Sequence, residues 1–471
     1  MTARSTWGEP AIAPGHEPSG PRPVVRRPSA EKEARSSIPA NEAVSVQRAL
    51  TVLAPLSPAK SRADLDRLLE RIGQNIATQQ DVDFGALKSV HFMRWVIVPA
   101  PRDDEGAPAS EDSLVMSTNF DGELDAHLDE LVTHAGPGFD AIFSFCEGYP
   151  LAGGKEASLA FLREHAVPHS TFYVGVVGRT RAQIVHEANL RRALEEYIDK
   201  TDLGSDPRAV ADALRTYVTN AGLSQPPPKR EVWPRRLGAF RRLVSVLPDL
   251  VRLLGSIGKF RELEETDEER PVDATREEMD HTEALVRNED RGGLLQNQLS
   301  HVVDVKSDPL RLVTIRLVLG VIDFLANLIF DSGKLGDIPT IHFARWVLIE
   351  GAPSRRPAAD GRAPTRSARV LFFSNFDGSW ENYLGDFIDK AAKGLTSIWS
   401  NTVGFPRTYF LLWRGALDEQ RFKTWTRAGQ LPTQVWFSAY PELTLRNITD
   451  NMKIREGLFD EKGDLEWLRR L

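Results

Sequence analysis

Cysteine is almost absent from this chain of 471 residues, and its scarcity excludes two kinds of structure. The one cysteine, Cys146, cannot form a disulfide within the chain and cannot build a site from several thiolates. It lies in the apolar stretch "IFSFCEGYP", so we expect a buried thiol with a packing role. A reactive or haem-ligating thiol is the alternative.

Long apolar runs and an excess of basic residues are also missing. No uninterrupted apolar run reaches the ~18 residues that a membrane-spanning helix needs. The formal net charge of −7 argues against a nucleic-acid partner. The N-terminus has no apolar signal-peptide core and is rich in Pro, Gly, Ser and Arg, which predicts a disordered tail over residues 1–40. We therefore expect a cytoplasmic protein, and the sequence leaves open whether it also associates with a membrane.

Several catalytic signatures are missing as well. The chain contains no GxSxG elbow, no P-loop, no HExxH and no GxGxxG. These absences argue against the common hydrolase, nucleotide-binding and dinucleotide-binding chemistries. No metal-ligand set can be assigned.

What the sequence does contain is an internal repeat. "VHFMRWVIV" at 90–98 matches "IHFARWVLI" at 341–349, an offset of 251 residues. Asn119-Phe-Asp-Gly122 matches Asn375-Phe-Asp-Gly378 at an offset of 256, and later matches have an offset of 264. Because the order is kept and the offset grows only in steps, we interpret the chain as a duplication.

Each copy is predicted to contain the same elements in the same order. In the first copy we predict strands at 49–56, 90–98, 113–120 and 170–177, and helices at 61–77, 122–132, 155–165 and 181–199. In the second we predict strands at 299–306, 340–349, 369–376 and 434–440, and helices at 310–330, from 379, at 418–428 and at the C-terminus. Without the inserted helices at 155–165 and 418–428, each copy has the βαββαβ order of a ferredoxin-like unit.

These patterns predict an α+β fold in which two tandem ferredoxin-like units cover each other's sheets, with a helical insert between them. The element order resembles the dimeric α+β barrel superfamily, and this resemblance implies a pseudo-dimeric barrel that encloses a pocket. The expected domains are a tail at 1–40, repeat one at 41–200, a linker with basic amphipathic helices and an acidic segment at 201–290, and repeat two at 291–471.

The repeated HFxRW strand carries candidate catalytic residues. Because side chains alternate along a strand, His91 is expected on one face and Arg94 on the other, so they would not act from one side of the sheet. His342 and Arg345 repeat this pair. Either each arginine pairs with a carboxylate and each histidine meets a backbone carbonyl, or one histidine is an acid/base or metal ligand between the sheets.

The Asn-Phe-Asp-Gly stretches carry a second set. Asp121 and Asp377 each end a strand before a predicted helix, where aspartate is a favoured N-cap, so we expect each to cap the helix that follows. The alternative is a catalytic acid that faces the pocket, with Asp377 the stronger candidate. The two joints occupy equivalent places in paired units, so they need not meet in one site. Ligand-binding candidates beside these motifs are Asn119, Asn375, Trp346 and Trp380.

The Asp-Gly pairs at 121–122 and 377–378 resemble the last two residues of the Gly-x-x-Asp-Gly motif of dye-decolourising peroxidases. Thr118 and Ser374 stand where that motif begins with glycine. The resemblance implies a haem-dependent oxidoreductase in which the aspartate acts on the distal side. His169, His186, His301 and His342 are available as a proximal ligand.

Residues 233–260 combine apolar residues at helical spacing with several arginines. A basic amphipathic helix with an aromatic anchor suits an anionic membrane surface. The candidate membrane contacts are Trp233, Arg235, Arg236, Phe240, Arg241 and Arg242. A helical hairpin packed on the barrel is the alternative, and the charged segment at 261–283 is expected to be exposed or disordered.

The sequence leaves three functions open. The first is a cytosolic or peripheral-membrane protein that binds an apolar small molecule or lipid in a pocket between the repeats. The second is the haem-dependent, peroxidase-like oxidoreductase. The third is a structural or interaction protein.

Overall fold

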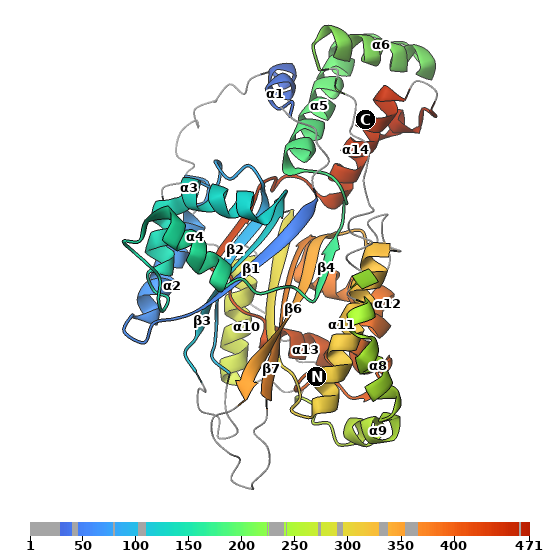
Figure 1. Cartoon of the computed structure of the whole chain (residues 1–471). Coiled ribbons are helices and arrows are strands. Elements are labelled where there is room, and N and C mark those ends of the chain that lie inside the picture. The colour runs from blue at the N-terminus through green and yellow to red at the C-terminus, as the bar shows by residue number, and fades with distance from the viewer. Residues whose placement is uncertain are drawn as a thin grey trace, which may run out of the picture.

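The computed structural model describes residues 29–39, 46–78, 81–101, 110–223, 225, 240–241, 243–271, 275–289, 295–328, 338–353, 366–460 and 463–471. The structure is mixed α and β with antiparallel sheets. Two four-stranded sheets lie at its centre, with helices on their outer faces (Figure 1).

The two sheets have matching strand orders. In the first, β1 (Gln47–Pro55), β3 (Ser113–Asp121), β2 (Val90–Val98) and β10 (Val435–Ser438) are neighbours in that order. In the second, the order is β5 (Gln296–Asp304), β7 (Arg366–Asp377), β6 (Ile341–Pro353) and β4 (Thr171–Val174). All eight strands overlap the positions predicted from the sequence.

Each sheet takes its fourth strand from the other half of the chain. Strand β4 pairs with β6, with Tyr173 opposite Ala344, and β10 pairs with β2, with Phe437 opposite Met93. The sequence prediction had assigned each repeat a sheet of its own. Neither sheet is complete without a strand from the other half, so the predicted repeats at 41–200 and 291–471 are not separable along the chain.

The registers of the two sheets also correspond. Gln47 lies opposite Asp121 in the β1–β3 pair, and Gln296 lies opposite Asp377 in the β5–β7 pair. Strands β2 and β6 each contain a register shift near their start, between Val90 and Phe92 and between Ile341 and Phe343, and β6 contains a second shift between Glu350 and Pro353. A β-bulge of this kind inserts one extra residue and re-aims its side chain. The extra residues here are the two histidines of the HFxRW strands.

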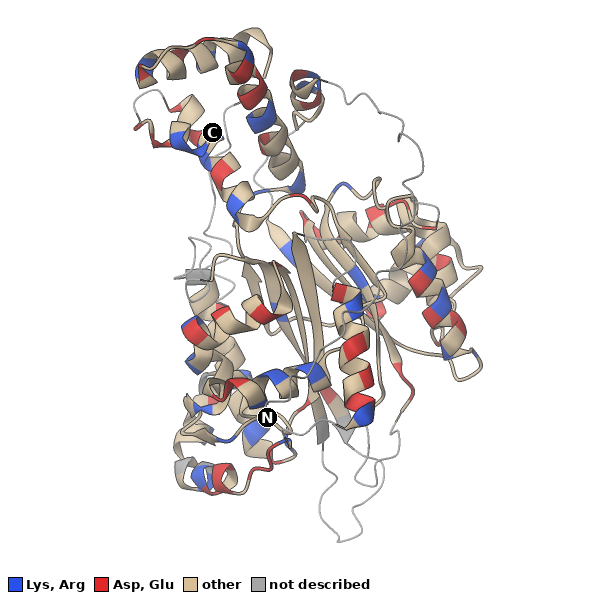
Figure 2. Cartoon of the chain, turned by 180° about the vertical axis from the view of Figure 1, so that it is seen from behind, with Lys and Arg blue, Asp and Glu red and all other residues tan. Residues whose placement is uncertain are grey.

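Helices cover the outer face of each sheet. The first sheet carries α2 (Arg62–Gln74), α3 (Leu124–Phe143) and α4 (Gly154–Glu164), and the second carries α11 (Pro309–Leu328), α12 (Trp380–Trp399) and α13 (Glu419–Gly429). Apolar periodicity explains this placement: Leu65, Leu69 and Ile72 of α2 share one helical face and are buried on the first sheet. Seen from behind, charged residues lie mainly on the helices, whereas the strands carry few (Figure 2).

A second group of helices lies beyond one end of the sheets. Helices α5 (Arg181–Lys200) and α14 (Leu445–Phe459) begin with capping boxes at Thr180 and Thr444 and pack against each other. Helices α1 (Ala30–Ser36) and α6 (Pro207–Asn220) complete this lobe. The tail predicted to be disordered to residue 40 is therefore helical at 30–36, because Ala34 is buried against the lobe.

The linker between the halves is also helical where it is described. It contains α8 (Leu247–Leu254), α9 (Ile257–Glu265) and α10 (Arg276–Glu289). Most described residues of the segment at 261–283 are exposed, as one of the two predicted alternatives had it, and the segment is held by ion pairs. Asp267 lies 2.7 Å from the Arg311 guanidinium, and Glu269 lies 2.5 Å from that of Arg421.

Candidate functional site

The bulges decide which way the two repeated histidines point. Val90 and Met93 pack on the helix side of the first sheet, but the His91 ring lies 5.2 Å from the ring of Phe343, which belongs to the other sheet. His342 likewise lies 5.4 Å from Phe92. The prediction that histidine and arginine lie on opposite faces was wrong, because strict alternation does not hold across a bulge.

Each histidine pairs with the aspartate of its own half. His91 Nε2 lies 2.9 Å from Asp121 Oδ1, and the second carboxylate oxygen accepts from the backbone N–H of Arg181 at 2.7 Å. His342 Nε2 lies 2.7 Å from Asp377 Oδ1, whose other oxygen accepts from the N–H of Leu445 at 2.7 Å. The two arrangements therefore match atom for atom.

The predicted caps fall on other helices than expected. Asp121 and Asp377 do not cap the helices that follow them; Ser379 caps α12 by accepting from the Asn382 N–H. The aspartates instead contact the first residues of α5 and α14, some 60 residues further along the chain. A carboxylate is favourable there because the N-terminus of a helix carries partial positive charge. Those helix starts follow β4 and β10, each of which lies in the sheet built mainly from the other half of the chain.

One of the histidines has a further partner. The hydroxyl of Tyr440, which follows β10, lies 2.8 Å from His91 Nδ1. Its ring lies 6.2 Å from that of His342, so the tyrosine lies near both histidines. Burial raises the pKa of Tyr440 well above its ordinary value, and the nearby Asp121 carboxylate adds to that shift. The phenol therefore stays protonated at neutral pH.

The two arginines cross the interface between the sheets. Arg94, on the first sheet, donates to Gln298 Oε1, the Leu299 carbonyl and Ser300 Oγ at 2.9–3.1 Å, and also to the Ser374 carbonyl and Asn375 Oδ1. Arg345, on the second sheet, donates to the carbonyls of Leu50 and Thr118 and to Ser117 Oγ. All of these acceptors belong to the opposite sheet and none carries a charge.

The expected partners are thus reversed. The sequence favoured arginine with a carboxylate and histidine with a backbone carbonyl, whereas the carboxylates bind the histidines and the carbonyls bind the arginines. Burial lowers the pKa of both Arg94 and Arg345 to about 9, and for Arg94 the charge of Arg345 contributes. The Phe373 ring lies 5.5 Å and 5.6 Å from the two guanidinium carbons. That aromatic face adds favourable electrostatics for two guanidinium groups that have no carboxylate partner among the described residues.

The two Asn-Phe-Asp-Gly motifs meet at this interface. Asn375 Nδ2 donates to Asn119 Oδ1 at 3.1 Å, and Asn375 Oδ1 accepts from Trp436 Nε1 at 3.0 Å and from Arg94. We call Asn119, Asn375, Arg94 and Arg345, with the two His–Asp pairs, the central polar cluster. Asn119 and Asn375 therefore bind each other across the junction.

The remaining ligand candidates lie elsewhere. Trp346 is buried between the second sheet and its helices, with its ring 4.5 Å from Phe372. Trp380 lies in the same core, beneath the Arg427 guanidinium at 3.6 Å. Neither tryptophan belongs to the central polar cluster, because both lie in the core between the second sheet and the helices that cover it.

The central polar cluster is suited to joining the halves. Apolar residues of both sheets pack on either side of it, including Phe92 and Phe343 in one group and Val96 and Val347 in the other. Its hydrogen bonds mostly run between protein groups of the two halves. Arg345 Nε is buried without a partner among the described residues, whereas most other polar groups of the cluster are hydrogen-bonded. A buried network of this kind specifies which surfaces pair and leaves its groups little capacity to bind a substrate.

A buried histidine outside the cluster has an unusual setting. His301, on β5, lines a cavity of about 20 Å³ between the second sheet and α12 and α13, with the rings of Trp399 and Trp425 at 5.4 Å and 4.8 Å. Neither ring nitrogen has a hydrogen-bond partner among the described residues. Burial lowers the pKa of His301 to about 3, although the nearby Trp425 carbonyl favours the charged form slightly. His301 is therefore neutral.

These features bear on the cofactor that the peroxidase resemblance implies. The carboxylates of Asp121 and Asp377 are already occupied by a histidine and a helix start. The His301 cavity has room for about one water-sized molecule. A porphyrin fits in neither place.

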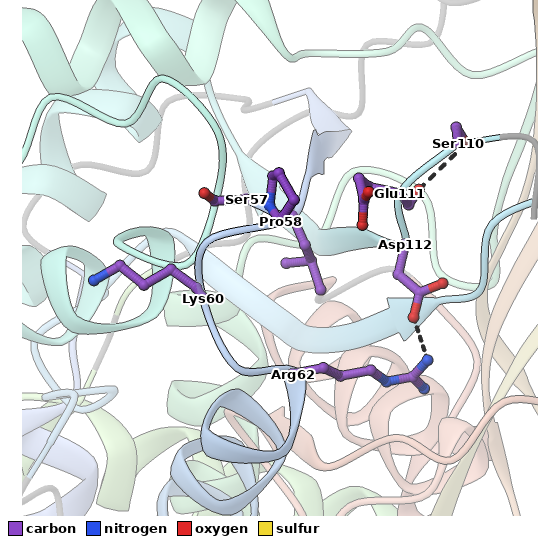
Figure 3. Close-up of a pocket in the computed structure, with 8 residues that line it drawn as sticks. Ser57, Pro58, Lys60, Arg62, Ser110, Glu111 and Asp112 are labelled. Atoms are coloured by element: carbon purple, nitrogen blue, oxygen red, sulfur yellow. Dashed lines mark hydrogen bonds and ion pairs between the residues drawn. The ribbon is translucent and has the colours of Figure 1, made fainter.

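A larger pocket lies at the surface, where β1 ends and α2 begins (Figure 3). Its volume is about 490 Å³ and its lining includes Lys60, Arg62, Glu111 and Asp112. The Arg62 guanidinium and the Asp112 carboxylate form an ion pair. Opposite charges thus offset each other, and none of the candidate residues lies in this pocket.

Two of the predicted membrane contacts can be located. Trp233, Arg235, Arg236 and Arg242 fall outside the described residues, whereas Phe240 and Arg241 are helical and exposed. In α8 and the helical residues just before it, four apolar side chains recur at helical spacing and face solvent. They are Phe240, Val244, Val251 and Leu254, with 46–71% of each exposed. We call this set the α8 stripe.

A second exposed apolar feature was not anticipated. Strands β8 (Thr408–Tyr409) and β9 (Trp413–Arg414) form a short hairpin with four large side chains exposed by 43–50%. These are Tyr409, Phe410, Leu412 and Trp413, which we call the hairpin tip. The run "YFLLW" reads as a buried strand, so hydropathy alone gave no signal for exposure.

Three further features were considered from the sequence: the single thiol, a metal site and a membrane-spanning helix. Cys146 is buried in the core of the first sheet, as expected, and burial raises the pKa of its thiol to about 12. Within the described ranges no three His, Cys, Asp or Glu side chains gather as a metal site, and no helix there is both long and apolar enough to cross a bilayer.

In comparisons with known proteins, no family model, no curated protein and no solved structure matches this chain.

Proposed function

We propose that this protein binds membrane lipids from the aqueous side, and that the α8 stripe is its contact surface. The single observation that carries the proposal is the direction of that stripe. In a helix that only supports a fold, the apolar residues face the core, and here they face solvent.

The stripe is not the packed side of its helix. Helix α8 packs against α11, and at its N-cap the Val246 side chain lies so close to Gly320 that a β-carbon on this glycine would come within 2.9 Å of it. The stripe lies apart from this contact, and its members belong to none of the hydrophobic core clusters. The helix is therefore anchored while its stripe stays available.

The magnitude suits reversible binding. Full burial of one such side chain contributes ~1.5–3 kcal/mol, so four that are about half exposed contribute roughly 3–6 kcal/mol on insertion. Arg241 and Arg252 flank the stripe, and 67% of the Arg252 side chain is exposed although it pairs with Asp249 at 3.2 Å. Each basic residue near an anionic surface adds about 1 kcal/mol.

This placement of the lipid differs from the pocket between the repeats that the sequence favoured. The central polar cluster and two apolar groups occupy the space between the sheets. The surface on α8 is the better supported contact.

Flotation of the full chain on vesicles tests the proposal. The double variant Val251→Ser/Leu254→Ser should bind phosphatidylcholine–phosphatidylserine vesicles roughly thirtyfold more weakly than wild type, since about 2 kcal/mol of apolar contact is lost. Leu151→Ser is the matched control, because Leu151 is 61% exposed and belongs to the other half. Wild type that stays with the unbound fraction, or equal flotation of all three proteins, contradicts the proposal.

We further propose that the scaffold consists of two duplicated ferredoxin-like units that form a pseudo-dimeric barrel and have exchanged their last strands. The matching strand orders, the bulges at His91 and His342 and the His–Asp pairs support it. An experimental structure in which the two halves fail to superimpose over β1–β3 and β5–β7 would refute it.

A further inference from the structure

The hairpin tip extends this proposal to a second element, and the inference below rests on the proposed membrane function. We infer that the β8–β9 hairpin, which packs on α9, inserts into the interface of an anionic bilayer and serves as an aromatic anchor. Four observations support it: the backbone of the tip, the residue that holds it, its exposed side chains and its cations.

The tip has a costly backbone. Phe410 and Leu411 have φ values of 51° and 62°, and Arg414 has 64°. These values lie in the left-handed region, which side chains other than glycine seldom adopt. Such conformations persist only where surrounding groups enforce them, and they cluster at functional positions.

One buried carboxylate enforces this conformation. Glu264 of α9 is 4% exposed and accepts hydrogen bonds from the Phe410 N–H at 2.9 Å, the Leu411 N–H at 2.8 Å and Thr408 Oγ1 at 2.8 Å. The carboxylate thus fixes both strained residues from one side. Because α9 follows α8 after two residues, the hairpin and the α8 stripe are connected through one short helix.

The fold itself gains little from this construction. Tyr409, Phe410, Leu412 and Trp413 belong to none of the hydrophobic core clusters and are each about half exposed. Strain that holds apolar side chains in water opposes folding. It is explained if the tip is buried against something else.

The surrounding charges indicate what covers the tip. The Lys393 ammonium lies 4.6 Å from the centre of the Trp413 ring, and the Arg261 guanidinium carbon lies 5.9 Å from that of Phe410. Arg261 also pairs with Glu265 at 3.4 Å, whereas Lys393 and Arg414 form no ion pair with a described residue. Tyrosine and tryptophan beside lysine and arginine match the headgroup region of an anionic bilayer.

Binding of the full chain to vesicles with and without phosphatidylserine tests the inference. Phe410→Ser/Trp413→Ser should weaken binding by about thirtyfold, as expected for two half-exposed aromatic rings that lose apolar burial. Lys393→Glu/Arg414→Glu should weaken binding only when phosphatidylserine is present. Leu151→Ser again serves as the control, and circular dichroism checks that each variant is folded.

The possible outcomes separate this inference from the proposed function. If wild type binds, the α8 variant fails and the hairpin variant binds like wild type, the inference is overturned and the proposed function stands. If wild type does not bind, both are overturned. If the hairpin variant instead abolishes a dimer of wild type in solution and leaves vesicle binding unchanged, the tip is a protein contact and the inference is wrong.

A second readout addresses the tip directly. Quenching of tryptophan fluorescence by vesicles of brominated lipid should fall when Trp413 is replaced by Phe, a substitution that keeps an apolar ring. Unchanged quenching in Trp413→Phe, with binding retained, overturns insertion of the tip.

Discussion

Replacing His301 by Val should make this protein more resistant to mild acid. The first half supplies the template for the substitution. His301 lies five residues after Gln296, which faces Asp377, and Val52 lies five residues after Gln47, which faces Asp121. Val52 is fully buried in an ordinary apolar core. The second half therefore carries an imidazole where the corresponding position of the first half carries an isopropyl group.

The magnitude follows from the pKa of His301, which is about 3 in the folded chain and ~6.5 when unfolded. Because the folded pKa is the lower one, the unfolded state binds more protons between these values, and stability falls as the pH drops from about 6.5 towards 3. At about pH 5 the loss relative to neutral pH is ~2 kcal/mol. A valine side chain at this position cannot be protonated, so the variant avoids this loss.

The assay is urea unfolding, followed by tryptophan fluorescence, at about pH 7.5 and about pH 5. The change in unfolding free energy between the two pH values should be ~2 kcal/mol smaller for His301→Val than for wild type. Other buried histidines, such as His186, whose pKa burial lowers to about 4, are present in both proteins and cancel. His134→Val is the control, because His134 is exposed and its loss should leave the wild-type pH dependence. An identical pH dependence in His301→Val refutes the reasoning.

Two further outcomes follow from the site. Asp121→Asn and Asp377→Asn should each lower the unfolding free energy by ~2 kcal/mol, because each removes a charge-assisted bond to histidine and a charge at a helix start. The urea midpoints of the two variants measure this loss. A change in only one of the two variants would contradict the equivalence of the two sites. Cys146 should resist a thiol reagent such as dithionitrobenzoate at about pH 8, since its pKa of about 12 leaves almost no thiolate. The thiol should react once urea unfolds the chain. Rapid labelling of the folded protein would show that the thiol is neither buried nor protonated as described.

Much of the secondary structure followed from local pattern. The apolar face of α2 and the helical patterns of α5 and α14 act between near neighbours in the chain, so periodicity located them. The bulge at His91 was missed because one inserted residue changes no composition and still reverses a side chain. The hairpin tip was missed because hydropathy measures what a residue prefers, not where the chain holds it.

The sequence by itself determined the repeated order of elements and the residue types at the junction. Both follow from interactions over a few residues and from the direct comparison of the two halves. Only the tertiary structure decided the partners: that β4 and β10 change sheets, that Asn119 meets Asn375, and that arginine takes carbonyls while histidine takes the carboxylate. Those choices depend on groups some 60 to 300 residues apart in the chain, whose distances arise only when both sheets pack.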